Sequence, residues 1–545
     1  MITKAYKNIL RTGAFALLFP LSSFLIVGCS DWDDHFDSPA SEAAGEQTLW
    51  QTLQQHSELS DFSEVLSKTM VFKHHRKTAV SYADLLNGVQ TFTVLAPVNG
   101  TFDKDSVLRL LSTNRGDSMV VRSFVGNHLS YNLTNSFDQP SEFFLLNAKR
   151  ATIGGNKVLD VPIQQANVKA KGGILHVLQQ TLPYRYNLYE ILLNDRRYSP
   201  IGEQLSSYEM DEFSPTQSVE GGMVDGEQIY VDSVFIERNR MLERVGLLAD
   251  EDSTFIAVLP TADEWQRVWQ EAMGYFRYDA TVENGDSLQR YWANYALLND
   301  AIFSRTIQSS PQDSLITYEY DQRYPKYHVF HRPFQPGGIL YGATPVDYSN
   351  GTLYTAATWP FTPQSTYHRE IKVEGERTGQ IVEYNNCIYS SRTHASDSVS
   401  ENEYLVITPL SATSNWTMSF KLDNTLAGAY DICAVILPLS VYNPNAELKP
   451  NKFTCEINYV DEEGTAKTFD CGNEKFSNDP LRVDTIVLAE NFVFPVCNYD
   501  QTNMKFTVSL KCNILARETR NFSREMFLDC IYLRPRKTPS TEPSI

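Results

Sequence analysis

The chain has 545 residues, 42% of them hydrophobic. This length requires several packed cores, since single cores stop growing beyond roughly 250–300 residues. Its 47 basic and 66 acidic residues give a net charge of −19. An acidic balance spread along the whole chain argues against nucleic acid and anionic membrane surfaces as partners bound through charge.

The first 28 residues are typical of an export signal. A basic start is followed by an apolar stretch over residues 14–27 that is too short for a comfortable membrane span. The stretch ends Leu-Ile-Val-Gly-Cys29, which resembles a bacterial lipobox. The resemblance implies a lipoprotein signal peptide over residues 1–28 and lipidation of Cys29. Two or more acyl chains on this cysteine would anchor the protein stably to a membrane. An ordinary secretory signal that contains a cysteine is the alternative.

Residues 29–45 form an acidic, polar tether that carries Asp31, Asp33, Asp34 and Asp37. This cluster resembles the signal that sends Bacteroidota lipoproteins to the outer face of the outer membrane. The resemblance implies a lipid-anchored protein of the cell outer membrane that faces the extracellular side. The alternative is a solvated linker that does not direct the protein to any compartment.

Two segments further on carry the main fold prediction. Residues 91–102 (Thr-Phe-Thr-Val-Leu-Ala-Pro-Val-Asn-Gly-Thr-Phe) predict a strand that breaks at Pro97, with Asn99 as the cap of a following helix. Residues 172–178 (Gly-Gly-Ile-Leu-His-Val-Leu) predict a glycine turn and a second short strand. With Asn127-His128 between them, they resemble the signature segments of the fasciclin-type domain. The resemblance implies an α+β fasciclin-like domain over residues 46–185, in which His128 and His176 are buried structural residues.

The same pattern returns later in the chain. Residues 253–265 again read as apolar strand, proline and a cap-like Thr261, and residues 350–354 look like the second signature. Tyr354 stands where the first copy has His176. We therefore expect a divergent fasciclin-like domain over residues 186–362.

From residue 366 to residue 536 the pattern is all-β. Short β-rich runs follow one another at the spacing of a sandwich, including 405–408, 416–422, 430–437, 453–460 and 526–533. The last run resembles the closing strand of galactose-binding-type jelly rolls, which serve as carbohydrate-binding modules. The fold class expected is thus multidomain: two α+β fasciclin-like domains followed by a jelly-roll-like β-sandwich and a polar tail over residues 537–545.

Seven of the eight cysteines lie in this C-terminal part, and their spacing fits no zinc pattern. Cys455 and Cys471 flank a turn-like segment at equal distance. If that segment is a hairpin, the two residues lie opposite each other and can form a disulfide. Buried free thiols are the alternative.

The sequence contains no nucleophile elbow, phosphate-binding loop, dinucleotide fingerprint or zinc-protease motif. We expect no enzymatic activity, no cofactor and no metal. Trp359 and Trp416 are the candidate ligand-binding residues, because aromatic rings stack on sugars and peptides.

The resemblances imply a surface lipoprotein that binds a polysaccharide or a peptide. In Bacteroidota, such proteins often accompany a TonB-dependent transporter and its surface lipoprotein, which suggests an accessory role in nutrient uptake. Two rivals remain: a cell-adhesion or matrix-binding protein without nutrient role, and a hydrolase whose active site lies in the C-terminal domain.

Overall fold

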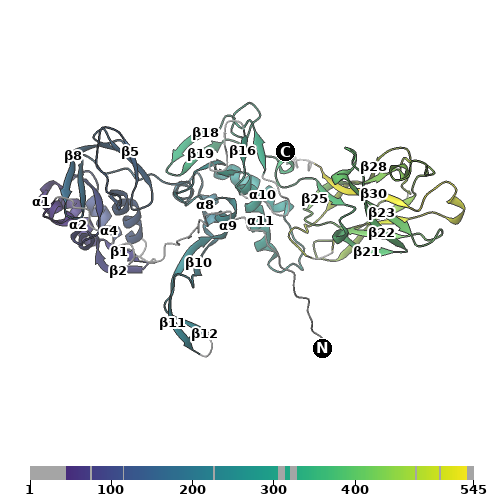
Figure 1. Cartoon of the computed structure of the whole chain (residues 1–545), viewed down its shortest axis with the longest axis horizontal. Helices are drawn as coiled ribbons and strands as arrows, with labels where there is room; N and C mark the ends of the chain where they lie inside the picture. Colours follow the sequence, from purple (N-terminus) through teal and green to yellow (C-terminus); the bar gives the residue numbers. More distant parts are fainter. Residues whose placement is uncertain are drawn as a thin grey trace, which may run out of the picture.

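The computed structural model describes residues 45–73, 76–113, 116–224, 227–304, 314–318, 328–472, 475–502 and 505–536. The predicted signal peptide, Cys29 and the polar tail lie outside these ranges. Three regions follow one another in chain order along the long axis (Figure 1). We name them the N-terminal region (residues 45–184), the middle region (185–368) and the C-terminal region (369–536).

The N-terminal region packs helices against a seven-stranded sheet with the order β4-β3-β9-β8-β7-β6-β5. Its helices are α1 (Leu49–Gln55), α2 (Ser60–Lys68), α3 (Tyr82–Asn87), α4 (Lys104–Leu110), α5 (Gly116–Val120) and α6 (Gly126–His128). Its strands are β1 (Met70–Lys73), β2 (Arg76–Ser81), β3 (Phe92–Pro97), β4 (Leu129–Ser130), β5 (Ser141–Phe144), β6 (Arg150–Gly154), β7 (Lys157–Val158), β8 (Val161–Ala170) and β9 (Gly173–Leu178). Strands β1 and β2 form a separate hairpin.

The two segments singled out in the sequence form the centre of this sheet. Strands β3 and β9 pair in parallel, and every residue of both is buried. A strand buried on both faces is apolar throughout, which is why neither segment shows polar alternation. In β3, Phe92 and Val94 pack on the helix side, whereas Leu95 joins a second cluster on the opposite side.

One local prediction was wrong. Asn99 does not cap the helix that follows it, because α4 begins later and uses Asp103 as its cap. Instead, Asn99 Oδ1 accepts a hydrogen bond of 2.9 Å from the backbone N–H of Asp61 in the first turn of α2. The side chain does satisfy an orphan helix donor, but that donor belongs to a helix earlier in the chain.

The middle region repeats the central motif. Its helices are α7 (Leu188–Asn194), α8 (Ser199–Ser206), α9 (Arg240–Val245), α10 (Ala262–Tyr275) and α11 (Gly285–Asn299). Its strands are β10 (Glu209–Phe213), β11 (Val219–Val224), β12 (Glu227–Asp232), β13 (Phe235–Asn239), β14 (Phe255–Pro260), β15 (Ile302–Ser304), β16 (Ser314–Ile316), β17 (Val329–His331), β18 (Thr344–Tyr348) and β19 (Gly351–Ala356). The four-stranded sheet has the order β15-β14-β19-β18.

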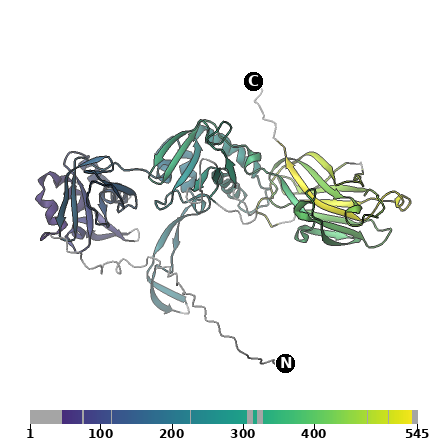
Figure 2. The ribbon, with the colours of Figure 1, turned by 45° about the horizontal axis from the view of Figure 1, so that its top comes forward.

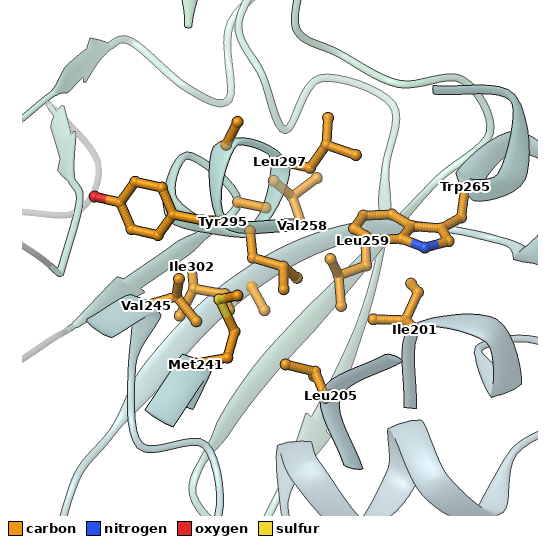
Figure 3. Close-up of a cluster of buried hydrophobic side chains, with 14 of the residues drawn as sticks. Ile201, Leu205, Met241, Val245, Val258, Leu259, Trp265, Tyr295, Leu297 and Ile302 are labelled. Atoms are coloured by element: carbon orange, nitrogen blue, oxygen red, sulfur yellow. The ribbon is translucent and has the colours of Figure 1, made fainter. Parts of the chain in front are cut away.

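Strands β14 and β19 pair in parallel with the same register as β3 and β9. Val258 lies opposite Tyr354, as Leu95 lies opposite His176, so the predicted replacement of histidine by tyrosine is confirmed. Around β14, side chains from α8, α9, α10 and α11 form one apolar cluster (Figure 3). The repeat seen in the sequence is therefore also present in the fold of the two regions.

The C-terminal region consists of two antiparallel sheets that share one hydrophobic cluster, which defines a β-sandwich. One sheet has the order β22-β23-β30-β25-β28, with β20 also paired to β30, and the other has the order β21-β24-β29-β26-β27. The strands are β20 (Ile371–Glu374), β21 (Ile381–Asn385), β22 (Cys387–Thr393), β23 (Glu403–Pro409), β24 (Thr417–Lys421), β25 (Gly428–Leu437), β26 (Phe453–Val460), β27 (Ala466–Asp470), β28 (Asp484–Phe494), β29 (Thr507–Cys512) and β30 (Met526–Pro535).

The N-terminal and middle regions are joined by a buried lysine. Lys149 Nζ lies 2.5 Å from Glu251 Oε1, 3.1 Å from Glu190 Oε2 and 3.1 Å from Ser349 Oγ. Its side chain is only 4% exposed. Burial would raise the pKa of Glu190, but hydrogen bonds from Tyr184 and Asn187 and the charge of Lys149 hold that pKa below its usual value. We call this contact the lysine joint.

No helix within the described ranges is both long enough and apolar enough to span a bilayer.

Candidate functional site

The middle and C-terminal regions meet along a close seam. The backbone that leaves α10 lies against three loops of the sandwich. Ala427 N–H donates to Tyr275 O at 2.9 Å, Cys497 N–H to Arg277 O at 2.6 Å, and Ala280 N–H to Glu462 O at 2.9 Å. Leu426 and Cys497 of the sandwich also belong to the hydrophobic cluster of the middle region. The two regions therefore share part of one core.

A buried ion pair reinforces the seam. Lys505 Nζ lies 2.9 Å and 3.1 Å from the two carboxylate oxygens of Asp279, whose side chain is 3% exposed. Burial would raise the pKa of Asp279, but hydrogen bonds from Thr281 and Lys505 outweigh it and keep the pKa low. The Asp279 carboxylate thus remains charged at neutral pH.

A pocket of about 310 Å³ opens in this seam, and both regions line it. This volume lies at the lower end of the roughly 300–1,000 Å³ typical of small-molecule sites. Its aromatic wall consists of Phe276, Tyr295, Tyr367, Tyr430 and Tyr499. Its polar groups come from Asn299, Asp300, Thr317, His328, Arg369, Glu370 and Asn424. A small number of polar groups among aromatic rings is the usual design of a site for a polar organic ligand.

The end of α11 positions the buried polar groups. Asp300 is the C-cap of this helix, is 2% exposed and makes a short contact with His328 Nδ1. The backbone N–H of His328 donates to Thr317 Oγ1 at 3.1 Å, which holds the backbone that carries the imidazole. The pair therefore presents an oriented imidazole to the pocket.

Asn299, one residue earlier, carries one of two unsatisfied polar atoms in the described pocket wall, the other being the Tyr430 hydroxyl. Asn299 is 8% exposed, and its Oδ1 accepts no hydrogen bond from any described residue. An unsatisfied buried acceptor costs about 1–3 kcal/mol, so proteins rarely keep one without a use. A ligand hydroxyl or amine can satisfy it.

His368 stands behind the pocket wall. It is fully buried between the rings of Tyr275 and Tyr430, at centroid distances of 4.6 Å and 4.8 Å. Neither ring nitrogen has a hydrogen-bond partner among the described residues. Burial lowers the pKa of His368 to about 4, so the ring is neutral at ordinary pH and acts as an aromatic spacer.

The two predicted ligand-binding tryptophans do not line this pocket. Trp416 is 1% exposed in the sandwich core, where its Nε1 donates to Arg524 O at 2.6 Å. A ring buried in this way is not available to stack on a ligand, so the prediction for Trp416 was wrong. Trp359 is half-buried, and its ring packs against Trp265 and Phe361 at 6.0 Å and 5.0 Å. Both residues therefore contribute to packing.

The predicted hairpin around Cys455 and Cys471 is present. The two residues face each other across β26 and β27, Cys471 N–H donates to Cys455 O at 3.0 Å, and the sulfur atoms are 3.3 Å apart. Both are free thiols in the structure, so the disulfide stays a prediction.

The two histidines predicted to be structural are buried with partners, as expected. His128 Nδ1 contacts Phe124 O at 2.8 Å, and its Nε2 accepts from Leu182 N–H at 3.0 Å. His176 Nε2 contacts Thr134 O at 3.0 Å. Neither side chain is exposed.

A second cluster was missed by the sequence reasoning, which expected no metal. Ligand atoms of Glu374, Asp529 and Cys530 lie within 4.8 Å of one another, and all three residues are buried. Glu376 follows two residues after Glu374, and one carboxylate oxygen of each glutamate has no hydrogen-bond partner among the described residues. Burial raises the pKa of Glu376 to about 7 and that of Asp529 to about 6. The positive charge of Lys372 lowers the pKa of Asp529 but does not outweigh burial.

These residues fit a hard divalent cation. Ca²⁺ prefers carboxylate oxygens, and a cation would stabilise the charged forms that burial disfavours. Burial also raises the pKa of the Cys530 thiol, so the sulfur stays protonated and the carboxylates are the candidate ligands. The sequence did contain a signal, because Asp529 interrupts the apolar run of β30.

Comparison with known proteins gives fold likenesses at low identity. No family model and no curated protein matches the chain. A FAS1 domain pair from the insect cell adhesion molecule Fasciclin I is 12% identical, covers 52% of this chain and 92% of its own, with a TM-score of 0.18. A xylan-binding domain from CBM 22 is 9% identical, covers 30% of this chain and 94% of its own, with a TM-score of 0.20.

The CBM22-1-GH10 modules of Clostridium thermocellum xylanase 10B, complexed with xylohexaose, are 10% identical. They cover 31% of this chain, which spans 29% of that chain, with a TM-score of 0.21. At these scores the functional argument rests on the geometry of the chain itself.

Proposed function

We propose that this protein is a non-enzymatic lipoprotein of the outer-membrane surface that binds a saccharide in the seam pocket. The observation that carries the proposal is the wall of aromatic rings next to Asn299, whose buried acceptor has no partner among the residues that the structure describes. Sugars offer apolar ring faces for stacking and hydroxyl groups for such acceptors. The neutral Asn and the oriented imidazole of His328 suit hydroxyl groups.

The test is calorimetric titration of the detergent-solubilised full chain with a panel of polysaccharides and their oligosaccharides. Asn299→Leu removes the unsatisfied acceptor at nearly constant volume. We expect affinity to fall by about tenfold or more, while thermal stability stays unchanged or rises. Asn521→Leu, at an exposed position outside the pocket, is the matched control. If the wild type binds no saccharide, or if N299L binds as well as the wild type, the pocket is not the binding site.

The nutrient-uptake role is a further part of the proposal. A TonB-dependent transporter and its surface lipoprotein are the partners expected for a lipid-anchored binder of this kind. Affinity purification of the tagged protein from gently solubilised native outer membranes should then recover both in stoichiometric amounts. Recovery of the protein alone would argue against this role.

An adhesion role is the second candidate, and the lysine joint favours it. A buried ionic contact between the first two regions holds them as a stiff spacer, which suits a stalk that presents the sandwich away from the membrane. Deletion of the protein should then abolish attachment or aggregation and leave growth on every polymer intact.

A hydrolase is the third candidate. The Asp300–His328 pair favours it, since an oriented imidazole can act as a base. Product release from the polysaccharide panel that D300N abolishes would establish it, and the absence of product from every polymer would argue against it.

A further inference from the structure

A long β-structured arm leaves the middle region. Strands β10 and β13 form its base and β11 and β12 its outer part, so the arm spans residues 209–239. It projects from the middle region in both views (Figures 1 and 2), and Arg76 of the N-terminal region lies 3.6 Å from its Asp232. Each ribbon has two strands, and no third strand among the described residues pairs with either one. Isolated two-stranded ribbons are marginally stable in water, so this arm needs support from elsewhere.

Apolar side chains stand exposed along the arm. The most exposed are Val231 at 72%, Met223 at 69%, Val219 at 54% and Phe235 at 46%. A surface of this kind, on strands with open edges, marks an interaction site or an aggregation hazard. The apolar content therefore favours a partner that covers the arm.

The charge of the arm indicates what that partner offers. Residues 209–239 contain eight acidic residues and one basic residue, a net charge of 1 − 8 = −7 out of −19 for the whole chain. The single basic residue, Arg238, is already paired with Glu212 and Glu243. Two copies of this arm would repel each other, and so would an anionic lipid surface.

One face of the base combines acidic and aromatic groups. Asp211 lies directly opposite Glu237 across the two strands, and both are exposed. Like charges in such a position destabilise a ribbon unless a cation lies between them. Two residues further along, Phe213 lies opposite Phe235, with ring centroids 5.7 Å apart. Because strand side chains alternate, both pairs share one face.

Tyr230 extends this face toward the tip of the arm. Its ring packs edge-on against Phe213 at a centroid distance of 4.8 Å. Carboxylates next to aromatic rings form the chemical environment that binds lysine and arginine side chains, through charge-assisted hydrogen bonds and cation–π contact. We propose that the face formed by Asp211, Phe213, Phe235 and Glu237 docks a lysine- or arginine-rich segment of a partner protein.

The first experiment measures binding of a defined probe to the solubilised full chain. The probe is a fluorescent peptide of alternating lysine and valine, and its glutamate–valine counterpart is the reference. We expect the cationic peptide to bind in a salt-dependent manner and the acidic one not to bind. The double variant D211K/E237K should weaken binding by about tenfold, since interfacial charge pairs contribute on this scale.

The matched control is E142K/E283K, which changes the net charge equally at two exposed glutamates outside the arm. It should leave the affinity nearly unchanged. F235S removes an aromatic ring without a change of charge and should also weaken binding, whereas Y341S, at a tyrosine that is 61% exposed elsewhere, should not. An equal loss in D211K/E237K and E142K/E283K would overturn the proposal, because the attraction would then be diffuse.

The second experiment identifies the partner in cells that naturally make the protein. A photo-crosslinking residue in place of Phe235 should give an adduct whose attached peptide is rich in lysine or arginine. An adduct to a second copy of this chain, to an acidic peptide or to lipid overturns the proposal. Circular dichroism of D211K alone checks folding, since this change places a cation opposite Glu237 and should preserve the ribbon.

Discussion

The two junctions between the regions depend on different kinds of interaction. The lysine joint is small and ionic, with one buried cation between Glu190 and Glu251. The seam is broad and shares a hydrophobic cluster, several backbone hydrogen bonds and the ion pairs Lys505–Asp279 and Arg277–Glu462. The first can fix an orientation through a few contacts, whereas the second is wide enough to enclose a pocket. We therefore expect single substitutions to disrupt the first junction and to be tolerated by the second.

The largest effect is expected for Lys149→Met. This change leaves the buried carboxylate of Glu251 without its cation, whereas Glu190 keeps its ion pair with Arg122. Breaking a buried ion pair in this way costs about 3–5 kcal/mol. Chemical denaturation should show the loss, and small-angle scattering should show that the N-terminal region no longer holds a fixed position. K68M, which breaks the exposed pair of Lys68 and Glu64, is the control and should change neither measurement. Equal stability of K149M and the wild type would show that the ion pairs of Lys149 do not hold the two regions together.

A divalent cation should stabilise the C-terminal region against unfolding, because the candidate ligands lie there. It should not stabilise the lysine joint or the seam. At a free Ca²⁺ concentration about 100-fold above its dissociation constant, the gain is about 2.7 kcal/mol. Without cation, the raised pKa values of Glu376 and Asp529 mean that these groups contribute stability at low pH, and that this contribution is lost as pH rises through about 6 to 7. The Ca²⁺ effect should therefore be largest above pH 7 and should fade below pH 5.

Calorimetry with and without Ca²⁺ at both pH values checks this prediction. E374Q/D529N should abolish the response to Ca²⁺. A response that persists in the double variant would place the ion elsewhere in the molecule.

These cases show what the sequence could and could not reveal. The fold of the first region was predictable because its signature is local: a Cβ on Gly173 would lie 2.1 Å from Phe92 O, and one on Gly351 would lie 2.2 Å from Phe255 O. Glycine is thus required where the second strand of each parallel pair begins. Trp416 also carried a local signal, because it shares the alternation of Met418 and Phe420, both of which lie in the core. This alternation predicts a buried Trp416, whereas its aromatic character alone suggested a ligand-binding residue.

The pocket and the joint had no comparable signal. The pocket wall joins residues from Phe276 to Tyr499, and the joint pairs Lys149 with Glu251. A buried charge or amide is visible in a sequence only as one polar residue among many. Its burial depends on how separate regions dock, which periodicity within one element does not encode.

Two buried histidines, His128 in the N-terminal region and His368 beside the seam, make the stability of the protein depend on pH. Burial lowers the pKa of both His128 and His368 to about 4, well below the unfolded value of about 6.5. Each buried neutral ring thus contributes stability that is present above pH 6.5 and is lost as pH falls toward 4. The loss is about 2 kcal/mol per ring between pH 7 and pH 5.

The two rings should respond differently to replacement by phenylalanine. His368 has no hydrogen-bond partner among the described residues, so H368F should keep or raise stability at pH 7 and remove its share of the acid sensitivity. H128F also removes acid sensitivity, but it leaves the Leu182 N–H without an acceptor and should destabilise the N-terminal region. Equal destabilisation by both changes would mean that His368 has a partner in the folded protein.

The smallest effect is expected for Lys505→Met at the seam. Asp279 loses its cation but keeps two donors in Thr281, and Lys505 is partly exposed, so the cost should be about 1–2 kcal/mol. Hydrogen exchange should rise in residues 275–281, whereas the middle and C-terminal regions should still unfold together because the shared core remains. Separate unfolding of these two regions in K505M would show that the seam, like the lysine joint, depends on a single charge. In that case the pocket would be a transient opening between two mobile parts, and ligand binding would have to restore the contact that the lysine provides.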